Sequence, residues 1–184
     1  MKKHYLTLGV ILTSVVMLSG CETPTTQRYS ISADSNVALK SLGVNGVGIG
    51  RFDSPATFDN TCRAIGPLRV SDNLTHTTYI QRAFEDELKV AGIHAPKNAQ
   101  VVLTGKVDKL EFSSSKGITG GYWSIALTLN SSNGKQMRVD EYYEFESGFS
   151  ATEACRNTAE AYSRTVQNLV QRTVTDTKFA TLVK

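Results

Sequence analysis

The side chains that could act as nucleophiles, general bases or metal ligands are few and widely spaced in this sequence. Beyond the first twenty residues there are two histidines, His76 and His94, which lie eighteen residues apart. Neither has a second histidine or a cysteine at the spacing of a zinc site. A nucleophilic Cys62 would need one of these histidines as its base, and the chain has no nucleophile-elbow pattern. We therefore expect no catalytic residue, no metal site and no cofactor.

A cluster of carboxylates is the other group that could do acid–base chemistry. It consists of Asp140, Glu141, Glu144 and Glu146. Paired carboxylates can serve as acid and base, but these residues lie on a predicted strand with one face in water. We interpret them as solvated charges.

The glycines between residues 42 and 52 are spaced somewhat like those of a nucleotide-binding loop. A dinucleotide fingerprint needs a third glycine where this chain has Arg51, and a helix where it has Asp53-Ser54-Pro55. The better interpretation is an Asn45-Gly46 turn that leads into a buried strand over residues 47–52.

The N-terminus has the pattern of an export signal. Lys2 and Lys3 precede an uncharged stretch, residues 5–17, which is too short to cross a bilayer of about 30 Å as a helix. The sequence Leu18-Ser19-Gly20-Cys21 follows, and it resembles the lipobox of bacterial lipoproteins. The alternatives are an uncleaved signal anchor and an ordinary secretory signal with an incidental cysteine.

The lipobox resemblance implies a lipid anchor on Cys21. In that family the cysteine sulfur receives diacylglycerol, the chain is cleaved before it, and the new N-terminus is acylated. Several acyl chains give stable membrane attachment, whereas one chain would be marginal. By the same resemblance, Glu22 in place of aspartate favours the outer membrane, with the domain on the periplasmic side.

The charge balance excludes a nucleic-acid partner. The chain of 184 residues has 20 Lys+Arg and 17 Asp+Glu. Removing Lys2 and Lys3 with the signal leaves 18 against 17, a net charge of +1. No basic run remains that could follow a phosphate backbone.

The domain organisation predicted from these patterns is simple. Residues 1–20 form a lipoprotein signal peptide, 21–36 form the lipidated N-terminus with a polar tether, and 37–184 form one domain. Fifteen flexible residues would span about 20 Å. An alternating stretch over 29–32 could instead be a short edge strand.

Export leaves two unmodified cysteines in an oxidising compartment, Cys62 and Cys155. Two cysteines allow one pairing, so we predict a structural disulfide between them, with two free buried thiols as the alternative. The bond would join the loop before the first predicted helix to the start of the last.

Hydrophobic periodicity predicts two helices and a small sheet. The first helix runs over about 75–91, and the second follows a capping box at Ser150–Glu153. Strands are predicted over 100–112, 120–130 and 136–145. The first of these changes phase near Asp108-Lys109, which indicates a bulge, and a two-residue hairpin at Asn133-Gly134 joins the last two.

The element order β-α-β-β-β-α predicts an α+β fold. We expect a two-layer sandwich with a roughly four-stranded, mainly antiparallel sheet, two helices on one face and the other face partly in water. This order resembles that of small envelope lipoproteins, namely the YajG-like group and the auxiliary lipoproteins of lipid-transporting ABC systems. The stretch 62–67, Cys-Arg-Ala-Ile-Gly-Pro, resembles an uncharacterised proteobacterial lipoprotein family.

These features favour a non-catalytic binding or accessory protein. We expect partners in the membrane, through the acyl chains, and in an envelope protein that is not identified. Tyr122 and Tyr142 on the exposed sheet face are a candidate docking surface, although core packing would also account for them. The alternative is a cell-envelope enzyme that acts on wall or lipid through a site without a sequence motif.

Overall fold

The computed structural model describes residues 23–184. The predicted signal peptide, the lipidation of Cys21 and the sorting role of Glu22 lie outside these residues. Among residues 23–184, none of the helices combines the length and the apolar character needed to traverse a bilayer.

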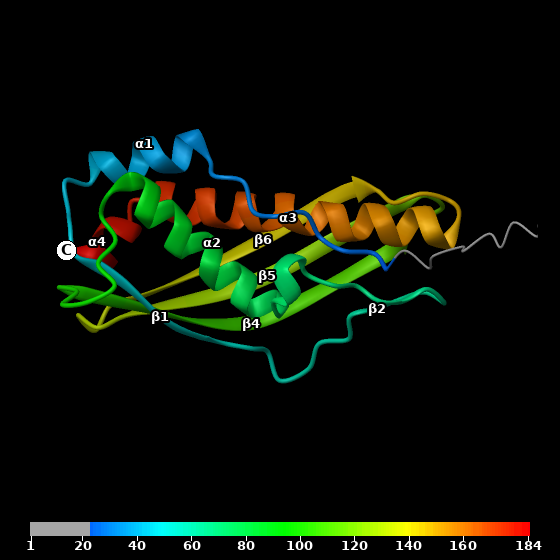
Figure 1. Ribbon diagram of the computed structural model, residues 1–184, viewed down its shortest axis with the longest axis horizontal. Coiled ribbons are helices and arrows are strands. Elements are labelled where there is room, and N and C mark those ends of the chain that lie inside the picture. Colours follow the sequence, from blue (N-terminus) through cyan, green and yellow to red (C-terminus); the bar gives the residue numbers. More distant parts are fainter. Residues whose placement is uncertain (1–22) are drawn as a thin grey trace, which may run out of the picture.

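A four-stranded sheet forms one layer of the domain (Figure 1). Its strands are β1 (Val47–Asp53), β4 (Val101–Lys116), β5 (Gly120–Ser131) and β6 (Gln136–Glu146), in the order β1-β4-β5-β6. Strand β1 runs parallel to β4, whereas the two other pairs are antiparallel. The expected α+β fold with a mainly antiparallel sheet is therefore confirmed.

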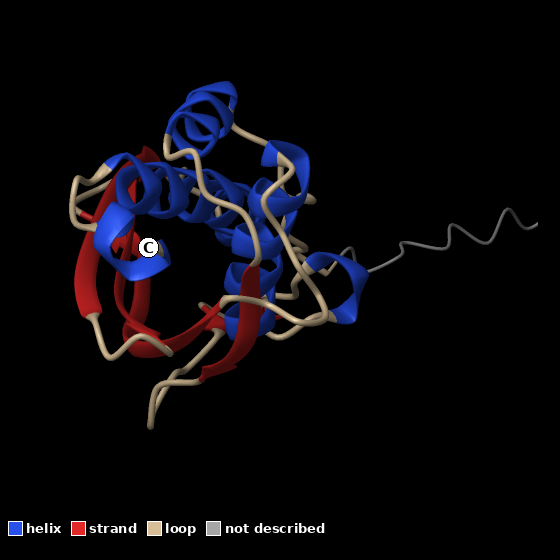
Figure 2. Cartoon of the chain, turned by 90° about the vertical axis from the view of Figure 1, so that its left-hand side faces the viewer, coloured by secondary structure: helices blue, strands red, loops and turns tan. Residues whose placement is uncertain are grey.

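The helices gather on one side of the curved sheet (Figure 2). The two long ones are α2 (His76–Ala91) and α3 (Ala151–Thr175), and a short α4 (Phe179–Val183) closes the chain. Ser150 of the predicted capping box accepts a hydrogen bond from the N–H of Glu153 and caps α3. Thr75 caps α2 in the same way through the N–H of Thr78, and Gly92 ends that helix in the left-handed conformation, with φ +77°.

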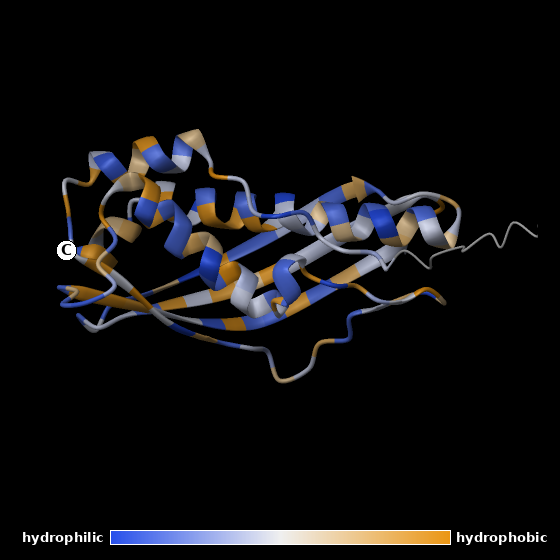
Figure 3. Cartoon of the chain, in the orientation of Figure 1, coloured by the Kyte–Doolittle hydropathy of each residue, from blue (hydrophilic) through white to orange (hydrophobic). Residues whose placement is uncertain are grey.

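The core lies between these layers. Apolar and polar residues alternate along the strands (Figure 3), so that Trp123, Ile125, Leu127 and Leu129 are buried against the helices. The indole N–H of Trp123 donates to the Thr158 carbonyl at 2.8 Å, which satisfies its one polar group inside the core.

The predicted bulge in β4 is present. Val107 pairs with Leu127 and Lys109 with Ala126, so Asp108 is the extra residue. The insertion lets Val107 and Leu110 both point into the core, although they are three positions apart.

The N-terminal segment differs from the prediction of a tether over 21–36. Arg69 N–H donates to the Pro24 carbonyl at 2.8 Å, and Thr26 N–H donates to the Arg69 carbonyl at 2.9 Å. Tyr29 Oη and Ser32 N–H donate to Glu87 Oε1 at 2.8 and 2.7 Å.

The domain therefore begins at about Pro24 rather than at residue 37. Residues 29–32 form no strand. Helix α1 (Ala33–Ser41), which the sequence did not reveal, contacts both α2 and α3. Only Ser35 and Leu39 of α1 are buried. A helix that buries so little needs no continuous apolar face, and its hydrophobic periodicity is accordingly weak.

The β5–β6 hairpin has a three-residue loop and not the two-residue turn that was predicted. Ser131 N–H donates to the Lys135 carbonyl at 2.8 Å, and Gly134 N–H to the Ser131 carbonyl at 2.9 Å. Gly134 alone of the loop has positive φ, at +84°. The loop is a turn followed by one left-handed residue, Gly134. An Asn-Gly pair is compatible with this three-residue loop and with the two-residue turn that was predicted.

Gly134→Val should lower the free energy of unfolding by about 1–2 kcal/mol, because a β-branched residue is strained at positive φ. Urea denaturation would measure it, with Lys135→Val as the matched control at the next position. Equal stability of the two variants would contradict this turn geometry.

Candidate functional site

A free edge on β4 arises because β1 is shorter than its neighbour. Their pairing ends at Asp53 with Lys106, where Ser54-Pro55 turns the chain away from the sheet. Strand β4 continues to Lys116. Its second half is therefore paired with β5 on one side only, and the chain over 54–70 passes along the other side at a distance (Figure 1).

A small hairpin forms the far wall of the space beside this edge. It pairs β2 (Thr61–Cys62) with β3 (Gly66–Pro67), and the 3₁₀ turn η1 (Ser71–Asn73) follows. Cys62 is bonded to Cys155 in the first turns of α3, with 5.8 Å between their Cα atoms. The predicted disulfide is thus present, and it attaches the hairpin to the helix layer.

Arg63 holds the hairpin to the end of β4. Its Nε donates to Ser114 Oγ at 3.1 Å, and a second guanidinium nitrogen donates to the Ser114 carbonyl. Its Nη1 donates to the Phe149 carbonyl at 3.2 Å. Sequence reasoning missed this residue. Its position next to a disulfide cysteine, in the Cys-Arg-Ala-Ile-Gly-Pro stretch, was the available clue.

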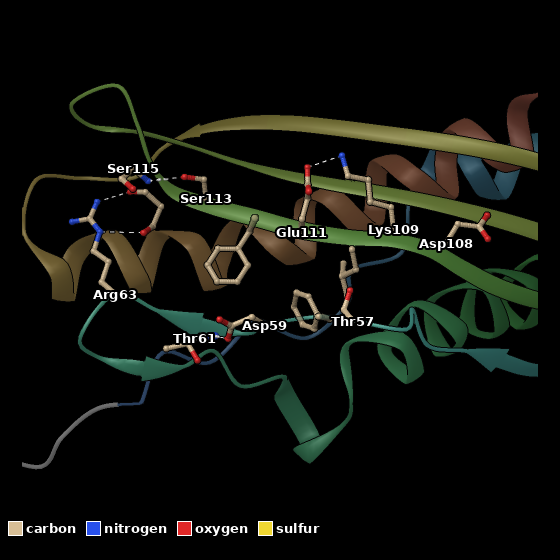
Figure 4. A pocket seen from close by; sticks show the side chains of 13 residues that line it. Thr57, Asp59, Thr61, Arg63, Asp108, Lys109, Glu111, Ser113 and Ser115 are labelled. Carbon is tan, nitrogen blue, oxygen red and sulfur yellow. Dashed lines mark hydrogen bonds and ion pairs between the residues drawn. The ribbon is translucent and has the colours of Figure 1, made fainter.

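Between the hairpin and β4 lies an open groove of about 720 Å³, here called the edge groove (Figure 4). Residues 57–63 provide one wall and 108–115 the other. Apolar side chains form its floor, with the rings of Phe58 and Phe112 6.4 Å apart and Leu110 beside them. The groove follows β4, and the three apolar side chains of its floor lie among ten polar or charged ones.

Charged side chains surround this floor, and they are paired locally. Lys109 Nζ contacts Glu111 Oε1 at 2.6 Å, and this hydrogen bond raises the pKa of Lys109. The hydroxyl of Thr128 donates to Asp108 at 2.6 Å and lowers the pKa of that carboxyl. Hydrogen bonding to Thr61 lowers the pKa of Asp59 in the same way. These shifts all move away from neutral pH and keep the groups charged.

A second cavity of about 700 Å³ lies behind Phe58, with Leu110 in its lining as well. His76 lines this second cavity, and only 7% of the residue is exposed. The ring packs against Phe58 and Tyr162 at centroid distances of 4.8 and 4.9 Å, and its Nε2 has no hydrogen-bond partner. Burial lowers the pKa of His76 to about 4, so the imidazole is neutral at pH 7.

The remaining residues that sequence reasoning considered lie apart from the groove. His94 follows α2, at the opposite end of that helix from His76, and pairs with Val47 in an isolated bridge. Gly48 and Gly50 lie in β1, where an added Cβ would meet Ala99 and Thr104 at 2.9 Å, so this segment is a close-packed strand as predicted.

The prediction that the four carboxylates of β6 are all solvated is wrong for Glu141. Asp140, Glu144 and Glu146 are exposed, but Glu141 points to the helix layer with an exposed fraction of 3%. Its Oε2 lies 3.2 Å from Arg172 Nε of α3. The alternation of the strand places Glu141 on the inner face, where a long arginine reaches it from the helix.

Tyr122 and Tyr142 lie on the outer face of the sheet, as predicted. Their rings stack at 5.2 Å, and Tyr142 is half exposed. Lys116 lies over the Tyr142 ring at 5.5 Å. Residues 23–184 contain no group of three His, Cys, Asp or Glu side chains that could hold a metal ion.

Comparison with known proteins identifies similarity in structure but not in sequence. No family model matches the chain, and no curated protein matches it. A crystal structure of a Xanthomonas campestris protein of family DUF330 has 13% identity and a TM-score of 0.52, over 83% of this chain and 90% of that one.

Two other solved structures are more distant. They are a minor lipoprotein from Acinetobacter baumannii (11% identity, TM-score 0.41, 75% of this chain and 93% of that one) and rare lipoprotein B from Shewanella oneidensis (10%, 0.41, 67% and 89%). These two are too remote to support an argument. The Xanthomonas structure shows that this chain shares its fold.

Proposed function

We propose that this protein is a lipid-anchored lipoprotein of the bacterial envelope and acts there as a non-catalytic binding module. Its ligand is an extended polypeptide segment of an envelope partner, which adds as a strand to the free edge of β4 in the edge groove. The lipobox sequence around Cys21 supports the anchor, and Glu22 favours the outer membrane, with the domain on the periplasmic side. The YajG-like and ABC-auxiliary lipoproteins are the groups with which we associate it.

The observation that carries the binding role is the part of β4 that continues beyond its last pair with β1 at Lys106. It extends as far as Ser113, because the carbonyl of Ser114 already accepts hydrogen bonds from Arg63 and from Ser147 Oγ. An unpaired strand edge presents backbone N–H and C=O groups that another strand can bind. Two features keep such a ligand in place. The disulfide at Cys62 and the hydrogen bonds of Arg63 fix the opposite wall, and the apolar floor accepts alternate side chains of the ligand.

The charges around the groove support binding rather than catalysis. General acid–base chemistry is best served by groups that titrate near the working pH. Lys109, Asp108 and Asp59 are shifted away from it, and His76 titrates near 4 behind Phe58. Alternating charges on the wall would instead select among peptide sequences.

Peptide selection tests this proposal. Binders would be selected from a library of random extended peptides displayed against the purified protein. Hydrogen exchange with a selected peptide should show new protection of those amides of residues 108–113 that face away from β5, since the alternate ones are already bonded to that strand. Thr57→Trp fills the groove from its exposed wall and should weaken binding about tenfold or more, since each lost backbone hydrogen bond costs on the order of 1 kcal/mol.

Thr181→Trp is the control, because Thr181 is exposed on α4, away from the groove. Selected peptides that tolerate Thr57→Trp and protect no amide of 108–113 would overturn the proposal.

A further inference from the structure

Three large apolar side chains are exposed in loops at one end of the domain. Ile118 in the β4–β5 turn is 82% exposed, Phe149 in the loop before α3 is 81% exposed, and Ile65 in the β2–β3 turn is 39% exposed. All three loops lie at the right-hand end of the long axis in Figure 1. Apolar residues grouped in this way indicate a surface that is covered in the working protein.

These loops are held together by hydrogen bonds. The N–H groups of Ser147 and Gly148 donate to the Thr119 carbonyl at 2.7 and 3.0 Å, which joins the β4–β5 turn to the loop before α3. Arg63 donates to the Phe149 carbonyl and so adds the β2–β3 hairpin. The three apolar side chains are therefore presented by one connected structure.

The described chain begins toward the same end (Figure 1). Pro24 is held by the backbone hydrogen bond from Arg69. Cys21 is only three residues before Pro24, so the Cα atoms of the two lie at most about 10–11 Å apart. Residues 24–36 pack on the domain, so they do not lengthen the flexible linker between the domain and an anchor at Cys21.

We propose that this end of the domain rests on the membrane, with Ile118 and Phe149 inserted at the level of the lipid headgroups and Ile65 beside them. This inference rests on the proposed lipid anchor at Cys21, which would bring the loops to the bilayer surface. Insertion transfers exposed apolar side chains out of water.

The charges at this end specify the kind of lipid contact. Lys116 is paired with Glu144, and the guanidinium of Arg63 binds backbone carbonyls. The exposed carboxylates of Glu146 and Glu153 are also nearby in the chain, and they offset the exposed Arg156 in the first turns of α3. The surface is therefore apolar and not basic, so contact should depend little on anionic lipid or on salt.

Tryptophan fluorescence of the lipidated protein tests this orientation. Ile118→Trp and Phe149→Trp variants would be purified in lipidated form and reconstituted into phosphatidylethanolamine–phosphatidylglycerol vesicles, with and without doxyl-labelled lipid. Val37→Trp is the matched control, because Val37 is 69% exposed on α1 toward the other end. The buried Trp123 contributes the same background to each, which the wild type measures.

The expected result is a blue shift and strong quenching by doxyl lipid for the residues at 118 and 149, at low and high salt alike, and neither change at 37. Quenching at 118 and 149 no greater than at 37, in protein that carries the acyl mass and floats with vesicles, would overturn the orientation and leave the anchor standing.

Two further outcomes are distinguishable. Protein without acyl mass that stays in the aqueous phase would refute the anchor itself. A blue shift that needs added envelope proteins and shows no lipid quenching would assign this surface to a protein partner and refute the membrane contact.

Discussion

Replacing both disulfide cysteines, Cys62→Ala with Cys155→Ala, should lower the free energy of unfolding by about 4–5 kcal/mol, which corresponds to a fall in Tm of about 10–20 °C. The bond closes a long loop, since its cysteines are 93 positions apart, and it restricts the unfolded chain accordingly. Thermal unfolding followed by circular dichroism would measure the change.

Reduction of the wild type supplies the control for this experiment. Reduced wild-type protein should melt near the temperature of the double variant, and unreduced protein should resist alkylation at both cysteines. Both sulfurs are fully buried, so they should be unreactive while the fold is intact. Free thiols in the unreduced native protein, or a double variant that melts with the wild type, would contradict a stabilising disulfide.

Acid should destabilise the protein through His76 by about 3 kcal/mol between pH 6.5 and 4, since each unit of pKa difference is worth about 1.4 kcal/mol. The unfolded chain binds a proton at this histidine below its ordinary pKa of 6.5, whereas burial in the folded state lowers that pKa to about 4. In this window the unfolded state alone gains the proton, so the stability present above pH 6.5 is lost as the pH falls toward 4.

His76→Phe isolates this contribution. Phenylalanine suits the aromatic cluster of Phe58, Trp123 and Tyr162, and it removes a buried nitrogen that has no hydrogen-bond partner. The variant should be at least as stable as the wild type at pH 7 and should lose less stability on acidification. Denaturation at several pH values gives the free energy of unfolding of both proteins. The contributions of the other titrating groups are common to both, so they cancel in the difference. Parallel curves across pH 4–6.5 would contradict the role of His76.

The local structure followed closely from the sequence. The helices at 76–91 and 151–175 and the bulge at Asp108 have local causes, namely a helix cap and the periodicity of apolar residues. The pairing of Cys62 with Cys155 followed from parity, because two cysteines allow only one bond.

Residues whose role depends on distant partners were not predictable in this way. A polar run of threonines and serines over 23–36 gives no sign that Glu87, 55 or more positions away, accepts hydrogen bonds from Tyr29 and Ser32. The loop length of the hairpin at Gly134 was missed because Asn-Gly is compatible with more than one turn.

The sequence by itself determined the α+β class, the main strands and helices and the disulfide, because these depend on periodicity, turn residues and cysteine number. Only the tertiary structure decided where β1 ends against β4, how Arg63 holds the β2–β3 hairpin, and that His76 is buried behind Phe58. The edge groove is the space between segments some fifty residues apart, and its shape is fixed by long-range contacts for which one sequence contains no local pattern.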